Sequence, residues 1–311
     1  MRWQATIWKV AAGVASGLLA FAAPDSTAVP GTLNYLEGQA SIDNRALDPR
    51  SVENQVLQPG EVLQTQNGKV EMLLTPGVFL RLGENSQARL VSPGLADTEV
   101  ALVKGQATVE ADAWSKNNRL KIDENGATVQ IEKKGFYVLN SKPPFVQVLD
   151  GKVKVLAGDQ HVNVGKDREA VLEINGKLKA RNFDDKAVKE ASLVRWSRLR
   201  SETEAEASYT AAQNVYAIGG WYGPGWYWAE PYGFWSYLPG DGILFSPFGW
   251  GFYSPGFVYY GGPYFYGGGG YFYGGRPYFG RVHPGPFRGG FHGGGFVRSG
   301  GFAGGMRGGR R

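Results

Sequence analysis

Apolar side chains recur at every second position in short runs along residues 31–182, and turn-forming residues separate the runs. Such alternation is typical of β-strands with one buried face. Asn-Gly and Asp-Gly pairs, such as Asn125-Gly126 and Asp150-Gly151, favour the positive φ of two-residue hairpin turns. The runs richest in strand-forming residues are Glu71–Leu74, Val78–Leu82, Val100–Val103, Thr128–Ile131 and Val146–Leu149. The pattern therefore predicts an all-β domain over residues 29–182.

One unit of this pattern occurs three times, and its copies align on a glycine that follows a charged residue. The copies are Leu33–Ile42, Val100–Val109 and Val146–Val155, and their glycines are Gly38, Gly105 and Gly151. We interpret each unit as a hairpin folded at the glycine. The glycines are 67 and 46 residues apart, so the units are not a strict short-period repeat. The prediction is a set of stacked β-hairpins of β-helical or solenoid type.

Four segments carry a resemblance to a known family: Leu36-Glu-Gly-Gln-Ala-Ser-Ile42, Pro59-Gly-Glu-Val-Leu-Gln-Thr65, Gly77-Val-Phe-Leu-Arg-Leu82 and Val148-Leu-Asp-Gly-Lys-Val-Lys-Val155. Together they resemble the FecR domain family, over residues 31–172. The resemblance implies a β-helical, hairpin-stacked extracytoplasmic domain. The best-known members sense a loaded outer-membrane iron receptor and signal to a sigma factor. They carry a cytoplasmic arm before a single membrane span, whereas only nine residues precede the apolar run here. The resemblance is thus to the extracytoplasmic β-domain only, and it transfers no functional residue.

The N-terminal segment has the layout of an export signal. Arg2 and Lys9 precede an uncharged, apolar run over residues 10–23, which Pro24 and Asp25 end. The run is shorter than the roughly 20 residues that a membrane span needs, which favours a cleaved signal peptide over residues 1–28; the alternative is an uncleaved anchor. We expect the rest of the chain to be exported, to the periplasm, the outer surface or the medium.

Residues 183–214 follow the β-domain and have a different pattern. Asp184 and Asp185 stand where a helix N-terminus needs a cap and negative charge, before a polar, Ala-rich stretch. The stretch predicts a connecting helix over residues 186–213. The alternating Glu202, Glu204 and Glu206 are interpreted as a solvated face or a frayed end of this helix.

The composition changes again near residue 215. Of the 47 glycines, 31 follow Ile218, and no Asp or Glu follows Asp241. We divide this part into a Trp/Tyr/Pro/Gly-rich segment, residues 215–260, and a Gly/Arg/aromatic low-complexity tail, residues 261–311, with too few aliphatic residues for a core. One interpretation is a largely disordered tail without a single ligand. The alternative is that the aromatic residues between 221 and 260 pack onto the β-domain.

The aromatic and basic residues of these two segments are the candidate binding residues. Aromatic ring faces stack on sugars or on one another, and Arg after residue 275 has no acidic counterpart. Because an exported protein does not meet RNA, we expect no nucleic acid as partner. The expected partner is an envelope protein or an anionic or glycan polymer. We also expect peripheral membrane association and self-association through the tail. The candidates are Trp221, Trp226, Trp228, Trp235, Trp250, Arg288 and Arg307.

No pattern of catalytic residues is recognisable. The chain has no Cys and three His, at positions 161, 283 and 292, which are not paired at metal-ligand spacing. His161 is interpreted as a surface residue of a strand. Ser141 lacks a nucleophile-elbow context, and the glycine clusters lack a phosphate-binding pattern. The sequence predicts a non-enzymatic protein without a cofactor, a metal or a catalytic residue.

Three hypotheses for the function remain open. The first is an exported interaction module in which the FecR-like domain binds a protein or an envelope polymer. The second is a structural or adhesive surface protein assembled through its Gly/aromatic tail. The third is a FecR-type signalling component that regulates a sigma factor in iron uptake, which requires a separate protein to supply the cytoplasmic arm.

Overall fold

The computed structural model describes residues 28–115, 117–172 and 177–259, and in addition the short paired strands β22 (Phe272–Tyr273) and β23 (Arg276–Pro277). Residues 1–27 of the predicted signal peptide, and Arg288 and Arg307 in the predicted tail, lie outside the described residues. Among the described helices, none is both long and apolar enough to cross a membrane.

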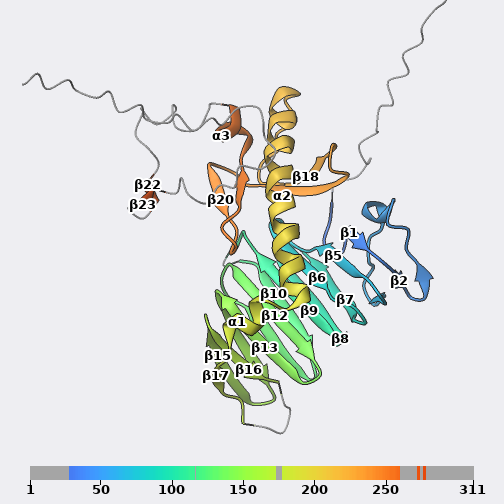
Figure 1. Ribbon diagram of the computed structural model, residues 1–311, viewed down its shortest axis with the longest axis vertical. Coiled ribbons are helices and arrows are strands. Elements are labelled where there is room, and N and C mark those ends of the chain that lie inside the picture. The colour runs from blue at the N-terminus through green and yellow to red at the C-terminus, as the bar shows by residue number, and fades with distance from the viewer. Residues whose placement is uncertain (1–27, 116, 173–176, 260–271, 274–275, 278–311) are drawn as a thin grey trace, which may run out of the picture.

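The strands between residues 33 and 182 form two large β-sheets, which confirms the all-β fold class (Figure 1). The eight-stranded sheet contains, in spatial order, β1 (Leu33–Glu37), β5 (Lys69–Leu73), β6 (Val78–Leu82), β9 (Gln106–Ala111), β12 (Gly135–Ser141), β13 (Pro144–Asp150), β16 (Arg168–Val171) and β17 (Ala180–Asn182). The nine-stranded sheet contains β15 (Gln160–Gly165), β14 (Lys152–Ala157), β11 (Ala127–Ile131), β10 (Arg119–Glu124), β8 (Asp97–Lys104), β7 (Gln87–Gly94), β4 (Val62–Thr65), β2 (Ala40–Ile42) and β3 (Arg45–Ala46). A short 3₁₀ helix, η1 (Val52–Asn54), precedes β4.

The strands are added to both sheets in nearly the order in which they occur along the chain. In the eight-stranded sheet the order rises from β1 to β17 without a reversal, and in the nine-stranded sheet only β2 and β3 are exchanged. The chain passes from one sheet to the other and back, adding one to three strands at each passage. The domain therefore grows in one direction, as the predicted solenoid-like stacking requires.

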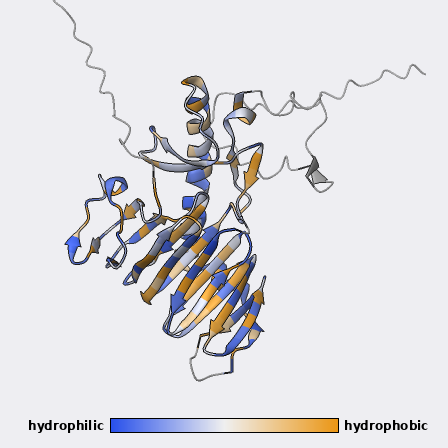
Figure 2. Ribbon diagram, turned by 180° about the vertical axis from the view of Figure 1, so that it is seen from behind, coloured by the Kyte–Doolittle hydropathy of each residue, from blue (hydrophilic) through white to orange (hydrophobic). Residues whose placement is uncertain are grey.

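Alternation of apolar and polar residues places the core between the two sheets. Figure 2 shows apolar and polar residues alternating along many strands. In β10, for example, Leu120 and Ile122 are fully buried, while Lys121 and Asp123, which alternate with them, are half-buried. Since successive side chains of a strand point to opposite faces, one face of each strand supplies the single large apolar cluster that fills the sandwich.

The three repeated units are not hairpins, and this prediction was wrong. The strands that flank Gly38, Gly105 and Gly151 belong to different sheets, so each unit is an arch that carries the chain across the core. The glycines have φ of 80°, 81° and 96°. A Cβ on Gly105 would lie 2.3 Å from Ser86 Oγ, and one on Gly151 would lie 2.2 Å from the Tyr137 hydroxyl. Glycine is thus favoured at these positions because the backbone is left-handed there and because neighbouring atoms leave no space for a Cβ.

True two-residue hairpins occur elsewhere. Asn125-Gly126 joins β10 to β11, with Glu124 opposite Ala127 and with φ of 49° and 76° at the turn. These values fit the turn that an Asn-Gly pair favours. The dipeptide prediction is confirmed here, whereas Asp150-Gly151 lies at one of the arches. Local turn chemistry therefore does not distinguish a hairpin from an arch.

After β17 the chain forms two helices, α1 (Asp185–Lys189) and α2 (Ser192–Ala217). The Asp184 carboxylate accepts hydrogen bonds from the backbone N–H groups of Lys186 and Ala187, at 3.1 and 3.4 Å, which confirms the predicted cap. The interpretation of Glu202, Glu204 and Glu206 as a solvated face was wrong for Glu204, which is completely buried. The reason is that α2 lies on the eight-stranded sheet and turns Glu204 toward it.

The remaining described elements surround the upper half of α2 (Figure 1). They are β18 (Gly225–Ala229), β19 (Phe234–Leu238), β20 (Ile243–Phe245), β21 (Gly251–Tyr253) and α3 (Pro255–Tyr259), with β18 paired to β19 and β20 paired to β21. We call α2 and these five elements the covering unit. Of the two interpretations of the aromatic segment, packing onto the β-domain is therefore the observed one for residues 221–259.

Candidate functional site

The outer face of the eight-stranded sheet carries charged side chains that the covering unit buries. In β5, Val70 and Met72 point into the sandwich, so Glu71 between them points outward. The same rule turns Arg81 of β6 and Glu110 of β9 outward. All three side chains are completely buried, because α2 lies over these strands.

These three residues form a closed ion network with two residues of α2. Arg81 Nε lies 2.7 Å from Glu71 Oε2, and its Nη1 pairs with Glu110. Arg200 Nη2 lies 2.8 Å from Glu71 Oε1 and 2.6 Å from Glu204 Oε1. The network therefore joins three strands of the sheet to the helix, and removing one partner would leave a buried charge without its counterion.

Two further hydroxyl contacts set the position of α2 on the sheet. Ser201 Oγ donates to Glu110 Oε1 at 2.5 Å, and Ser197 Oγ lies 2.8 Å from Thr108 Oγ1. Both serines are fully buried. Small side chains on this face of the helix allow it to approach the sheet closely enough for direct hydrogen bonds.

The network contains more carboxyl groups than guanidinium groups, and burial changes their pKa values. Burial alone would raise the pKa of Glu71, but Arg200 and Arg81 outweigh it and hold the pKa well below its usual range. Burial, together with the nearby Glu71, raises the pKa of Glu204 well above its usual range. A raised pKa favours the neutral form of Glu204, and Glu71 is then the carboxylate that contacts both guanidinium groups.

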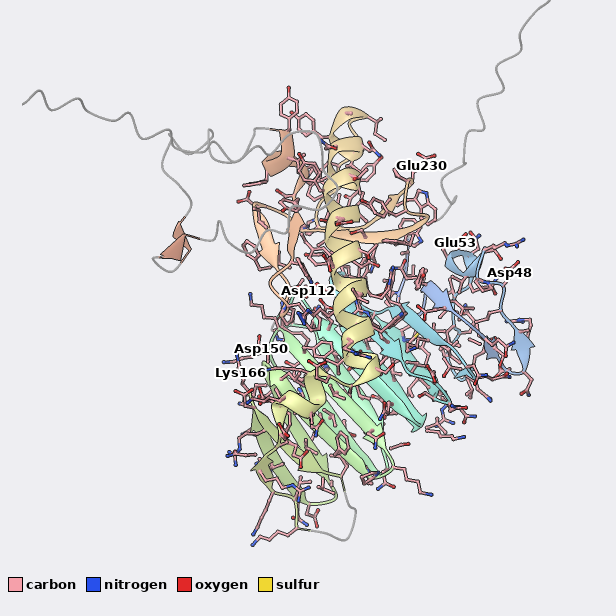
Figure 3. The ribbon with its side chains drawn as sticks, in the orientation of Figure 1. Asp48, Glu53, Asp112, Asp150, Lys166 and Glu230 are labelled. Carbon is pink, nitrogen blue, oxygen red and sulfur yellow. The ribbon has the colours of Figure 1, made fainter. Side chains whose placement is uncertain are left out.

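Asp112 follows Glu110 at the end of β9 and is also completely buried. Neither of its carboxyl oxygens has a hydrogen-bond partner among the described residues. Burial, and then the neighbouring Glu110, raise the pKa of Asp112 well above its usual range. Figure 3 shows Asp112 near the lower half of α2. A neutral carboxyl group is the form that such an environment favours.

Asn34 of β1 connects the ion network to the β18–β19 hairpin. Its Nδ2 lies 2.9 Å from Glu71 Oε1, 2.9 Å from Glu204 Oε1 and 3.0 Å from the backbone oxygen of Trp235, so three acceptors share its two N–H groups. Its Oδ1 accepts from the Trp235 N–H at 2.9 Å. Ser236 Oγ adds a hydrogen bond to the Glu204 backbone oxygen at 2.8 Å. The hairpin is thus held to the sheet and to α2 through fixed polar contacts.

Aromatic packing completes the attachment of the covering unit. The Trp226 ring meets Phe79 of the sheet edge-on, with centroids 5.1 Å apart, and Trp228 and Trp235 form a second edge-on pair at 5.5 Å. Trp226 and Trp235 are less than a tenth exposed. Their large apolar area contributes to holding the hairpin in place.

A cleft opens at the C-terminal end of α2, away from the sheet. Its volume is about 440 Å³, and nine residues from α2, the following loops and α3 line it. Trp221 is half-buried there, and its ring stacks on Tyr227 with centroids 5.4 Å apart. Tyr216 also lines the cleft and stacks on Tyr259 at 3.7 Å. The lining includes one carboxylate, that of the exposed Asp241.

The structure places the predicted binding residues in two different environments. Trp226 and Trp235 are buried in the covering unit, Trp228 and Trp250 are half-buried against the same cluster, and Trp221 alone of the five lines the cleft. His161 is exposed on β15 at the edge of its sheet, as predicted. In the part of the chain that the structure describes, no group of three or more His, Asp or Glu is arranged to hold a metal ion.

The ion network was not predicted from the sequence. Glu71, Arg81 and Glu110 stand at the polar positions of alternating strands, where solvent exposure is the ordinary expectation. The sequence does contain an acidic and a basic residue on consecutive strands, Glu71 and Arg81, and later an Arg200/Glu204 pair at helical spacing. These residues indicate an ion network only once the strand register, with Glu71 opposite Arg81, is known.

The fold and this covered face define the chain as a two-sheet, solenoid-like β-protein with a helical and aromatic covering unit. Residues 61–154 match the family described as FecR protein. This range runs from the start of β4 into β14, so the resemblance predicted from the sequence is confirmed for the central strands of both sheets. The covering unit lies outside the matched residues.

Among solved structures, two crystal structures of a putative anti-sigma factor from Parabacteroides distasonis ATCC 8503, at 2.50 and 1.65 Å resolution, are similar to this chain. The sequence identities are 16% and 15%, and both TM-scores are 0.37. The similarity covers 41% of this chain and 62% of each of those chains. No curated protein sequence matches the chain significantly.

Proposed function

We propose that this protein is an exported, non-enzymatic envelope protein in which a FecR-like domain supports an aromatic surface that binds an envelope polymer. The observation that carries the proposal is the fixed attachment of the aromatic segment 221–259 to the sandwich. A segment held by hydrogen bonds from Asn34 and by ring packing on Phe79 presents its remaining rings in a constant arrangement.

The accessible aromatic residues gather around the upper end of α2. Tyr222 is 92% exposed, Tyr259 is 59% exposed, and Trp221, which directly precedes Tyr222, lines the cleft. Exposed aromatic rings of this kind are more typical of binding surfaces than of an ordinary solvated surface. The signal peptide predicted for residues 1–28 supports export, and the Arg residues that follow position 275 supply positive charge for an anionic polymer.

Co-sedimentation of the full mature chain with purified envelope fractions tests this proposal. The fractions are peptidoglycan sacculi and vesicles of phosphatidylglycerol, and cell fractionation with an epitope-tagged chain tests export in parallel. We expect export and binding to the sacculi. A chain that stays in the cytoplasm, or that sediments with neither fraction, would contradict the proposal.

A second candidate is a FecR-type signalling component, and the family match over residues 61–154 favours it. In this case the covered sandwich would bind another envelope protein that carries the signal onward. The genes next to the coding sequence distinguish the candidates, because a sigma factor and an outer-membrane receptor beside it would support signalling. Their absence, together with polymer binding, would favour the first candidate.

A further inference from the structure

We infer that the cleft at the C-terminal end of α2 is a binding site for an uncharged saccharide, in which Trp221 is the stacking platform and Asp241 accepts hydrogen bonds from sugar hydroxyl groups. This inference rests on the proposed function and names the ligand class and the residues of the site.

The size and lining of the cleft suit a small polar ligand with an apolar face. A volume of about 440 Å³ falls within the range of roughly 300–1,000 Å³ that is usual for small-molecule sites. Such sites combine aromatic walls with few polar groups. A pyranose ring has this duality, because its C–H face packs on an aromatic ring while its hydroxyl groups need polar partners.

The Trp221 ring is positioned before any ligand arrives. It stacks on Tyr227, whose hydroxyl donates to the Gly223 backbone oxygen at 2.8 Å and accepts from the Tyr222 N–H at 3.0 Å. Tyr227 thus supports the ring from one side and also fixes the loop that carries it. A platform that loses little freedom on binding contributes more affinity than a mobile ring does.

The charge of the lining residues favours neutral over anionic saccharides. Asp241 is the single charged residue among the nine that line the cleft, and none of the nine is basic. A carboxylate accepts hydrogen bonds from two adjacent hydroxyl groups but repels a carboxylate or phosphate on a sugar. The cleft therefore fits a neutral hexose or N-acetylhexosamine unit, and anionic polymers remain ligands for other parts of the surface.

Gly256 of α3 also lines the cleft. A Cβ built on this glycine has no heavy atom within 4 Å, so a side chain there extends into open space. Gly256→Leu should consequently fill the cleft without altering Trp221 or Asp241. This substitution provides an independent way to block the site.

Isothermal titration of the mature chain with chitotriose and cellotriose, as neutral probes, tests the inference. We expect the wild type to bind. Trp221→Ala and Gly256→Leu should each lose affinity about tenfold, and Asp241→Asn about threefold to tenfold. Trp221→Phe, which keeps an aromatic ring, should bind with nearly the affinity of the wild type. Matched controls are Leu199→Ala, which removes an exposed apolar side chain from another face of α2, and Glu230→Gln, which removes an exposed carboxylate at the β18–β19 turn (Figure 3).

Equal affinity in the wild type, Trp221→Ala and Gly256→Leu would overturn the inference, as would the absence of binding to both probes. If the wild type binds neither probe but still sediments with sacculi, the cleft assignment fails and the proposed function stands. If it sediments with no envelope fraction and binds no probe, both fail. Circular dichroism of each variant shows whether an affinity loss is a folding defect.

Discussion

The two faces of the eight-stranded sheet are packed by different means. Its inner face meets the nine-stranded sheet through apolar side chains, such as Val70, Leu80 and Val109, which have at most 1% of their surface exposed. Its outer face meets the covering unit through Glu71 and Arg81, which are equally buried. Apolar burial is non-directional, whereas buried ion pairs require one geometry. The inner face therefore supplies stability, and the outer face determines where α2 and the aromatic hairpins sit.

A surface ion pair elsewhere in the chain shows why burial matters in this comparison. Lys166 and Asp150, both labelled in Figure 3, are 3.6 Å apart, and their side chains are about half exposed. Exposed pairs of this kind contribute roughly 0–1 kcal/mol. The pairs of the network are shielded from water, so losing one member has a far larger consequence.

The largest effect is expected from Arg81→Met. It leaves Glu71 and Glu110 buried without their shared counterion, which should lower the free energy of unfolding by about 3–5 kcal/mol in urea denaturation. Replacing these three residues with apolar ones, in Glu71→Leu/Arg81→Met/Glu110→Leu, leaves Arg200 paired with Glu204, whose pKa Glu71 no longer raises, and should restore much of this loss. If the triple variant is less stable than Arg81→Met, the network is not a self-contained unit.

The inner face should respond in the ordinary way to the loss of volume. Leu80→Ala removes a side chain with 1% exposure, and we expect a loss of about 2–5 kcal/mol. Unlike that of Arg81→Met, this loss should not depend on pH between 5 and 8, because the apolar core around Leu80 has no charge to balance. Urea titrations at both pH values provide the measurement, and a clear pH dependence would weaken the contrast between the faces.

Asn34→Ala should detach the hairpin more than it disturbs the sandwich. The substitution leaves the Trp235 backbone groups without their partners, and we expect a loss of about 1–3 kcal/mol. Faster amide exchange in β18 and β19 than in β10 and β11 is the expected signature. Thr128→Ala, which removes a hydrogen bond to Asp123 from the nine-stranded sheet, is the control that should leave the hairpin unchanged.

Glu124 is a buried carboxyl group on the face of β10 that also carries Leu120 and Ile122, and it should make stability depend on pH. It is 2% exposed, neither carboxyl oxygen has a hydrogen-bond partner among the described residues, and burial raises its pKa to about 9. A carboxyl whose folded pKa lies above its unfolded value of 4.5 binds more protons in the folded state. Stability should therefore fall as the pH rises from 4.5 toward 9.

Glu124→Gln should remove this part of the pH dependence and raise stability at pH 8 by about 1–3 kcal/mol relative to the wild type. Thermal unfolding at pH 5 and pH 8 measures it, with Glu230→Gln as the exposed control. A pH profile that stays unchanged in Glu124→Gln would contradict the assigned protonation.

The sequence predicted the repetitive part of the fold and missed its long-range contacts. Strand alternation, the Asn125-Gly126 hairpin and the Asp184 cap are local properties, and each is present in the structure. The arch at Gly105 looked like a hairpin because a turn residue does not reveal whether the next strand pairs with the last one. Glu71 looked solvated because the helix that covers it lies more than a hundred residues later.

The sequence predicted that aromatic residues form the candidate site, but not which of them line it. A Trp- and Tyr-rich segment was expected to stack, yet nothing in the glycine-rich sequence distinguishes Trp226, which packs on Phe79, from Trp221, which lines the cleft. Trp226 lies in β18, whose pairing with β19 fixes its place against the sheet, whereas Trp221 lies in the loop before β18. The tertiary position of each residue, and not the composition, separates the two.

Amide hydrogen exchange of the wild type and Arg81→Met most directly tests whether the ion network holds the covering unit in place. We expect exchange to accelerate together in α2, β18 and β19, and much less in β10, β11 and β14 of the nine-stranded sheet. Equal acceleration in every element, or unchanged protection of α2, would contradict it.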